Sequence, residues 1–253
     1  MPHILVRRPS PRLAEGELTH LHRQPVDTDL AVRQWHGYVA AFADRGWRVI
    51  EVEPADQHPD GVFVEDTVVM AGKLAVLTCP GAPSRRGEVA SMAAAVAALG
   101  LPVGRITEPG RLDGGDVLKV GTTVYVGRSA RTDEEGIRQL RELVEPDGLR
   151  VVAVPVSKVL HLKSGVTALP DGTVIGYEPL VDDPSVFGTF LPVPEEHGTA
   201  VVVLDEKTVL MSAGAPRSRE LFAGRGFAVV AVPISEFEKL EGCVTCLSVR
   251  IRG

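Results

Sequence analysis

Cysteine is scarce in this chain: Cys79, Cys243 and Cys246 are the three thiols among 253 residues. Three unevenly spaced thiols are too few for a disulfide framework. Cys243 and Cys246 match a C-x-x-C pattern, but they lie in β-branched, strand-like sequence, and no second pair supplies two further zinc ligands. Thioredoxin-type redox chemistry and a structural zinc site are therefore weak interpretations of this pair.

A surplus of basic residues and long apolar runs are also missing. The formal net charge is −6 and Lys and Arg are dispersed, so we expect no nucleic-acid partner. Only residues 4–6 form an apolar run before Arg7 and Arg8, too short for a signal peptide or a membrane span. We therefore expect a cytoplasmic protein without membrane contact. A dinucleotide-binding G-x-G-x-x-G loop is absent too.

The chain does have 44% hydrophobic residues, enough for a packed core, and we expect residues 1–253 to form a single domain. One pattern recurs along it: a helical stretch, a glycine, and a short apolar strand that usually ends near proline. Hairpins are predicted between these strands, pairing 62–70 with 74–78, 117–120 with 123–126, 166–169 with 173–175, and 201–204 with 208–211. The repeat glycines are Gly46, Gly100, Gly148, Gly188 and Gly226.

Each unit therefore runs strand, strand, helix, strand, and the fourth unit, around residues 179–192, has little helical pattern. The C-terminal strand around Cys246 lacks a hairpin partner, and so does the N-terminal segment 3–7. Pairing these two segments would close a ring and leave no unpaired sheet edge. The sequence thus predicts an α/β protein, a five-bladed α/β propeller with pseudo-fivefold symmetry.

Polar residues at matching positions of the repeat predict a central pocket. Asp66 and Cys246 lie 20 residues after their repeat glycines, and Asp113 and His161 lie 13 after theirs. Equivalent positions of a closed ring face one axis. Taken alone, Cys246 is more typical of a buried core thiol and His161 of a structural histidine. Together with carboxylates they fit a nucleophile, an acid/base and an orienting group.

Further charged residues indicate the kind of substrate. Glu65 and Asp66 are neighbours in an apolar run, so strand alternation would point them to opposite faces and let one meet a cationic ligand. Arg85 and Arg131 lie at predicted helix starts, where cations oppose the helix dipole but suit carboxylate binding. An amino acid that carries a guanidinium fits this set.

Several sequence strings resemble the dimethylarginine dimethylaminohydrolase family, of the guanidino-modifying, pentein-fold superfamily. They are FVED (63–66), GAPSRRGE (81–88), LDGGDVL (112–118), SARTD (129–133), LHLKSG (160–165) and TCLSVR (245–250). The resemblance runs from about residue 3 to 250 and is weakest at 178–200. It implies a dimethylargininase, a hydrolase of linear amidines that converts asymmetric dimethylarginine or monomethylarginine to citrulline plus dimethylamine or methylamine.

The resemblance also implies residue roles in a reaction that passes through a covalent thiouronium and needs no cofactor. Cys246 corresponds to the nucleophile, His161 to the proton donor and acceptor, and Asp113 to the residue that orients the histidine. Asp66 corresponds to the residue that holds the guanidinium. The other substrate contacts implied are Asp60, Glu65, Arg85 and Arg131, with main-chain groups at Leu18 and Leu240.

Alternatives remain open at this point. An arginine deiminase would share the fold and the thiol but release ammonia, and a non-catalytic guanidine-binding or redox-sensing protein would show no turnover. Cys243 receives no role, and zinc could inhibit by capturing Cys246 and His161. We expect a lid loop within residues 13–26, and the chain to be a monomer or a homodimer.

Overall fold

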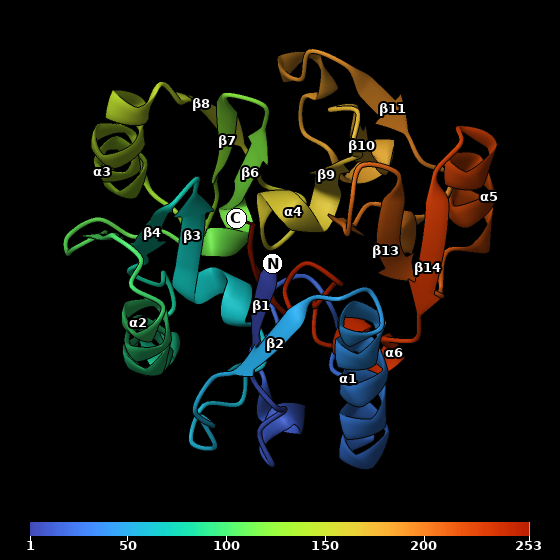
Figure 1. The fold of residues 1–253 in the computed structure, drawn as a ribbon, viewed down its shortest axis with the longest axis horizontal. Helices are drawn as coiled ribbons and strands as arrows, with labels where there is room; N and C mark the ends of the chain where they lie inside the picture. The colour runs from blue at the N-terminus through green and yellow to red at the C-terminus, as the bar shows by residue number, and fades with distance from the viewer. Residues whose placement is uncertain (253) are drawn as a thin grey trace.

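The computed structural model describes residues 1–252. These residues form five three-stranded sheets arranged around a common centre, as the repeat predicts (Figure 1). In each sheet the middle strand pairs antiparallel on one side and parallel on the other.

The sheets follow one another along the chain, except that the last one joins both ends. In spatial order they are β3 (Val68–Ala71), β4 (Leu74–Leu77) and β5 (Val103–Arg105); β6 (Val117–Val120), β7 (Thr123–Arg128) and β8 (Arg150–Pro155); β9 (Val166–Ala168), β10 (Val174–Gly176) and β11 (Phe190–Pro192); β12 (Val201–Val203), β13 (Thr208–Ser212) and β14 (Ala228–Val232); and β15 (Val249–Ile251), β1 (His3–Val6) and β2 (Arg48–Glu51).

Helices cover the outside of the ring (Figure 1). They are α1 (Thr28–Ala43), α2 (Val89–Ala98), α3 (Glu134–Val144) and α5 (Pro216–Gly224). In α1 the Asp27 carboxylate caps the Leu30 N–H at 2.8 Å, and Trp35, Tyr38 and Phe42 are buried against the sheets. Between β10 and β11 the chain has only 3-10 turns, at Glu178–Leu180 and Pro184–Val186, as the weak helical pattern there indicates.

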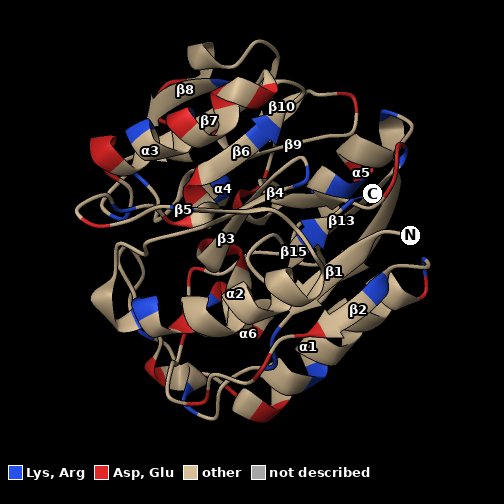
Figure 2. Ribbon diagram, turned by 60° about the vertical axis from the view of Figure 1, so that its left-hand side comes forward, with Lys and Arg blue, Asp and Glu red and all other residues tan. Residues whose placement is uncertain are grey.

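Strand β1 closes the ring by pairing antiparallel with β15, with His3 opposite Ile251, and parallel with β2. Both chain ends therefore lie near the centre (Figure 1). Charged residues of both signs are interspersed over the same elements (Figure 2). None of the helices within residues 1–252 is long and apolar enough to cross a membrane.

Two predicted strands begin later than the sequence pattern suggests. The segment 62–70 contains a 3-10 helix (Val64–Thr67) before β3, and β15 starts only at Val249. Strand β9 begins at Val166 as expected, directly after the short helix α4 (Leu162–Gly165). The apolar residues of these segments are buried, so the composition resembles that of a strand. The backbone bends there because segments from different sheets crowd together at the centre: a Cβ on Gly114 would lie 2.0 Å from the Glu65 carbonyl oxygen.

Candidate active site

Four polar residues meet at the centre of the ring, each just before the first strand of its sheet. Asp66 lies in the 3-10 helix before β3, Asp113 precedes the 3-10 turn before β6, and His161 is the N-cap residue of α4 before β9. Cys246 lies in the turn before β15. The repeat thus brings together residues that are up to 180 positions apart in sequence.

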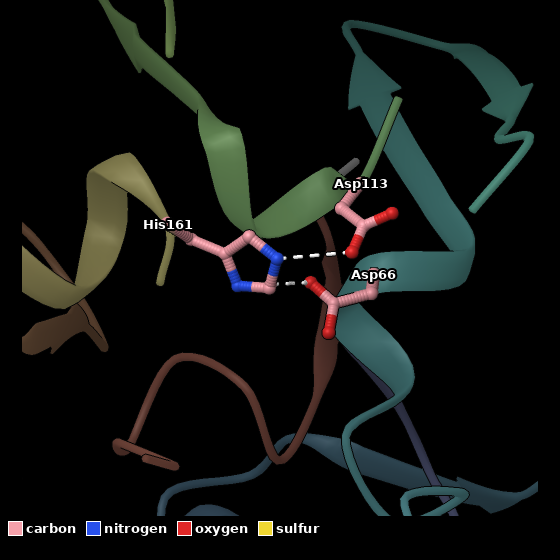
Figure 3. A group of neighbouring side chains, drawn as sticks. All are labelled: Asp66, Asp113 and His161. Atoms are coloured by element: carbon pink, nitrogen blue, oxygen red, sulfur yellow. Dashed lines mark hydrogen bonds and ion pairs between the residues drawn. The ribbon is translucent and has the colours of Figure 1, made fainter. Parts of the chain in front are cut away.

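The His161 ring faces two carboxylates, those of Asp113 and Asp66 (Figure 3). Its Nε2 is 2.9 Å from Asp113 Oδ2, and its Nδ1 is 3.8 Å from Asp66 Oδ1. The other Asp113 oxygen accepts the Gly81 N–H at 2.8 Å, which fixes the carboxylate. Burial alone would lower the pKa of His161, but the charge of Asp66 and the hydrogen bond to Asp113 raise it to about 9.

The glycines of the LDGGD string permit this packing. A Cβ on Gly115 would lie 2.6 Å from both His161 Nδ1 and Asp66 Oδ1, so a larger residue would push the histidine away from its carboxylates. The Gly115 N–H also donates to Asp66 Oδ1 at 2.9 Å.

Asp66 is held by Arg85 on its other side. Asp66 Oδ2 is 2.5 Å from an Arg85 terminal nitrogen, and Arg85 also binds the Glu88 carboxylate at 2.8 Å. Burial alone would raise the pKa of Asp66, but the charges of His161 and Arg85 lower it to about 2. Asp66 is therefore a fixed negative charge beside the imidazole.

Cys246 forms a pair with Cys243. Residues 243–246 make a turn in which the Cys246 N–H donates to the Cys243 carbonyl at 3.1 Å, and the two sulfurs are 3.3 Å apart. The hydrogen bond between the two sulfurs raises the pKa of Cys246 well above its usual range, and burial raises it further. The same hydrogen bond lowers the pKa of Cys243 to about 7. The directions differ because either sulfur can be the donor, so the pair acts as one acid that shares a proton.

A cavity of about 20 Å³ lies beside these groups. Residues from several units of the ring and from the segment 13–26 line it: Glu17, Asp60, Phe63, Asp66, Arg85, Arg131, Leu160, His161, Leu240, Glu241, Gly242 and Cys246. A thiol, an imidazole and a permanent carboxylate facing one space can bind a cation and attack it.

Comparison with known proteins places this geometry in a family. No protein-family model matches the chain. A curated dimethylarginine dimethylaminohydrolase from Streptomyces coelicolor is 62% identical over 248 residues, which cover 98% of this chain and 96% of that protein. The chain belongs to the dimethylarginine dimethylaminohydrolase family. The curated family member from Pseudomonas aeruginosa is 37% identical over 253 residues, covering 98% of each protein.

Solved structures of family members have the same fold. A mutant of the Pseudomonas aeruginosa enzyme complexed with citrulline matches with a TM-score of 0.91 and 36% identity over 98% of both chains. A cyanobacterial arginine dihydrolase domain matches with a TM-score of 0.85 but 21% identity, a likeness of fold alone. The comparisons confirm the predicted family, the five-bladed fold and the dimethylargininase function.

Most of the residues expected at the site line this cavity, but three do not. Leu18 packs against the apolar cluster under α1, and its neighbour Glu17 lines the cavity instead. Glu65 points the other way: it binds Lys163 at 2.7 Å and Arg250 at 2.6 Å, and it lines a separate cavity of about 590 Å³. Asp113 is fully buried behind His161 and reaches the cavity only through it.

Sequence reasoning gave no role to two residues that shape the site of this dimethylarginine dimethylaminohydrolase family member. Asp116 is fully buried and accepts the Leu162 N–H at 2.9 Å and the Ser129 hydroxyl at 2.7 Å, which positions the helix that follows His161. Burial raises its pKa to about 6. The second aspartate of LDGGD was a usable signal for it. Glu17 lies in an irregular loop, where no periodicity could have indicated it.

Asp66, Asp113 and His161 also form the group within residues 1–252 whose ligand atoms could surround a metal ion. Their atoms already bind one another and Arg85, so a metal would have to displace these contacts. The expected zinc inhibition through Cys246 and His161 stays a prediction.

Proposed function

We propose that this chain hydrolyses asymmetric dimethylarginine and monomethylarginine to citrulline and dimethylamine or methylamine, with the whole chain acting as one catalytic unit. The observation that carries the proposal is the meeting of Cys246, His161 and Asp66 at one cavity in a chain 62% identical to a curated family member. Cytoplasmic location and a monomeric or homodimeric state remain predictions.

Substrate binding follows from the charges. Asp66 attracts the guanidinium, while Arg131 and Asp60, farther along the cavity, suit the α-carboxylate and the α-ammonium. Backbone groups at Leu240 and Leu18 would complete the amino-acid end. Arg85 already binds Asp66 and Glu88, so we assign it first to fixing Asp66 and second to attracting the carboxylate.

Binding also prepares the nucleophile. Buried carboxylates raise the free energy of a Cys246 thiolate, and a cation placed between them and the sulfur removes that cost. The Cys243 N–H points at the Cys246 sulfur at 3.5 Å and can donate to the thiolate. We therefore assign the attacking thiolate to Cys246 once substrate is bound.

The covalent step forms a bond between the Cys246 sulfur and the guanidinium carbon. Protonated His161 then gives its proton to the nitrogen of the methylated amine, the carbon–nitrogen bond breaks, and a thiouronium remains. Neutral His161 takes a proton from water, whose oxygen adds to the same carbon. The carbon–sulfur bond breaks, its electron pair returns to the thiolate, the remaining hydroxyl proton passes to the released amine, and neutral citrulline leaves. Asp113 keeps the imidazole aimed throughout.

The test compares asymmetric dimethylarginine with arginine at equal concentration while citrulline and the amine products are measured. Each methyl group removes an N–H donor and adds apolar bulk, so a site built for one substrate leaves buried groups unpaired with the other. We expect methylated arginine to be preferred in kcat/KM by about a hundredfold. Dominant release of ammonia would instead identify an arginine deiminase, and absence of citrulline would indicate a non-catalytic protein.

A further inference from the structure

The segment between the 3-10 helix Leu13–Glu15 and α1 places one side chain, Glu17, in the cavity. One oxygen of its carboxylate accepts from an Arg131 terminal nitrogen at 3.0 Å, and the other accepts from the Ser84 hydroxyl. The backbone N–H of Glu17 donates to Asp60 Oδ2 at 3.1 Å.

Glu17 thereby offers a carboxylate to Arg131 and an N–H to Asp60. The substrate would offer the same contacts, with its α-carboxylate to Arg131 and its α-ammonium to Asp60. Among the described residues no other carboxylate contacts the Arg131 guanidinium. The cavity that remains, about 20 Å³, has room for about one water molecule and not for an amino acid. An amino acid therefore fits only if a lining group moves, and Glu17 is the group that occupies both Arg131 and Asp60.

The rest of the loop is anchored independently. The Glu241 carboxylate accepts the backbone N–H groups of Thr19, His20 and Leu21 at 2.8, 2.5 and 3.0 Å. The Glu17 side chain can consequently leave Arg131 while residues 19–21 stay in place. Its 41% exposed side chain has solvent to move into, whereas Arg131 is only 12% exposed and stays behind as the binding group.

We propose that Glu17 is a specificity-determining residue that competes with the substrate's amino-acid end for Arg131 and Asp60. This inference rests on the proposed function. A site that is closed by an internal competitor binds its ligand more weakly in proportion to the fraction of molecules that are open. A ligand with both a carboxylate and an ammonium replaces both contacts of Glu17, but a guanidine without that end replaces neither and is excluded.

The experiment uses the full chain with Glu17→Ala and Glu17→Gln. Glu15→Gln is the matched control, because Glu15 ends the 3-10 helix just before Glu17 and its carboxylate binds Arg12 on the surface. With asymmetric dimethylarginine we expect Glu17→Ala to lower KM by about threefold to tenfold and to leave kcat within about twofold, as for loss of a partly solvated ion pair. Glu17→Gln should show a smaller fall, and Glu15→Gln none.

Citrulline binding, measured by calorimetry on the same proteins, separates this inference from the proposed function. Tighter binding to Glu17→Ala than to the wild type supports the competition even if turnover were absent. Equal or weaker binding, or a KM that is unchanged or raised, overturns it and makes Glu17 a residue that helps to hold the substrate. Absence of citrulline formation by the wild type would overturn the proposed function alone.

Discussion

At the scale of single residues, the site is a balance of buried charges. His161 is a cation that faces Asp66 and Asp113, and Arg85 neutralises the other oxygen of Asp66. The Cys246 sulfur beside them contacts Cys243 and makes no hydrogen bond to a cationic side chain within the described residues. Substitutions of single residues in this group should therefore affect citrulline formation and stability to different extents.

Replacement of the two paired thiols should have unequal consequences. We expect Cys246→Ser to abolish citrulline formation, because a hydroxyl is a far weaker nucleophile than a thiolate. Cys243→Ser should keep most of the activity, because that sulfur lines a different cavity, of about 340 Å³. Comparable losses of citrulline formation in both variants would contradict this and favour the redox or zinc interpretation of the C-x-x-C pair.

The raised pKa of His161 should appear as a pH-dependent stability. A pKa of about 9 in the folded protein, above the ordinary 6.5, means that protonated His161 stabilises the fold fully below pH 6.5 and loses this contribution as pH rises to about 9. The contribution of His161 protonation is the difference in unfolding free energy between the wild type and His161→Gln. Titration of the thiols cancels in this difference, because both proteins keep them.

Across that window we expect the wild type to lose about 3 kcal/mol relative to His161→Gln. Urea unfolding at pH 6, 7.5 and 9 measures the difference. A constant difference would mean that the imidazole is neutral in the folded protein at all three values.

At the scale of elements, three segments meet in an ion cluster under the site. Glu65 from the 3-10 helix before β3 binds Lys163 of α4 and Arg250 of β15. Its second oxygen is buried and has no hydrogen-bond partner among the described residues. The cluster separates the small catalytic cavity from the larger one, which the first strands of all five sheets line.

We expect Glu65→Gln to destabilise the protein by about 3 kcal/mol, because it leaves two buried cations without a counter-charge. Lys163→Met should cost less, since Arg250 still pairs with the carboxylate. The KM for dimethylarginine should change little in Glu65→Gln, which urea unfolding and steady-state kinetics would check together. A raised KM at unchanged stability would place Glu65 in contact with substrate, as the family resemblance implies.

The sequence was informative about elements and less so about their ends. Repeat glycines and hairpins predicted the five sheets, because turn chemistry and alternating burial act locally. The bends at 64–67 and 243–246 were not predictable, since they arise from crowding between segments that are distant in sequence. The direction of Glu65 depends on Lys163 and Arg250, and the place of Glu17 on Arg131 and Asp60, contacts that no local pattern contains.

At the scale of the whole molecule, the pairing of β1 with β15 makes the position of the chain ends nearly arbitrary. We expect a circular permutant that joins residue 252 to residue 1 by a short Gly/Ser linker and opens between Glu206 and Lys207 to fold. That hairpin tip is exposed, and β12 and β13 carry no residue of the proposed catalytic set.

The kcat/KM of the circular permutant should stay within about threefold of the wild-type value, because every strand keeps its neighbours in the five sheets. Circular dichroism and citrulline formation test this. Truncation after Ser248 is the contrasting variant: it removes β15, leaves an edge of β1 unpaired, and should prevent folding. A permutant that fails while the truncation folds would show that the ring is not what holds the molecule together.

The same pairing has a consequence for synthesis on the ribosome. Cys246 and β15 are translated after every other residue of the site, while β1, the strand that β15 joins, is translated before all of them. A nascent chain thus carries His161, Asp66 and Asp113 without their nucleophile. The thiol reaches them only when β15 has left the exit tunnel and paired with β1, so closure of the ring and onset of reactivity are a single event.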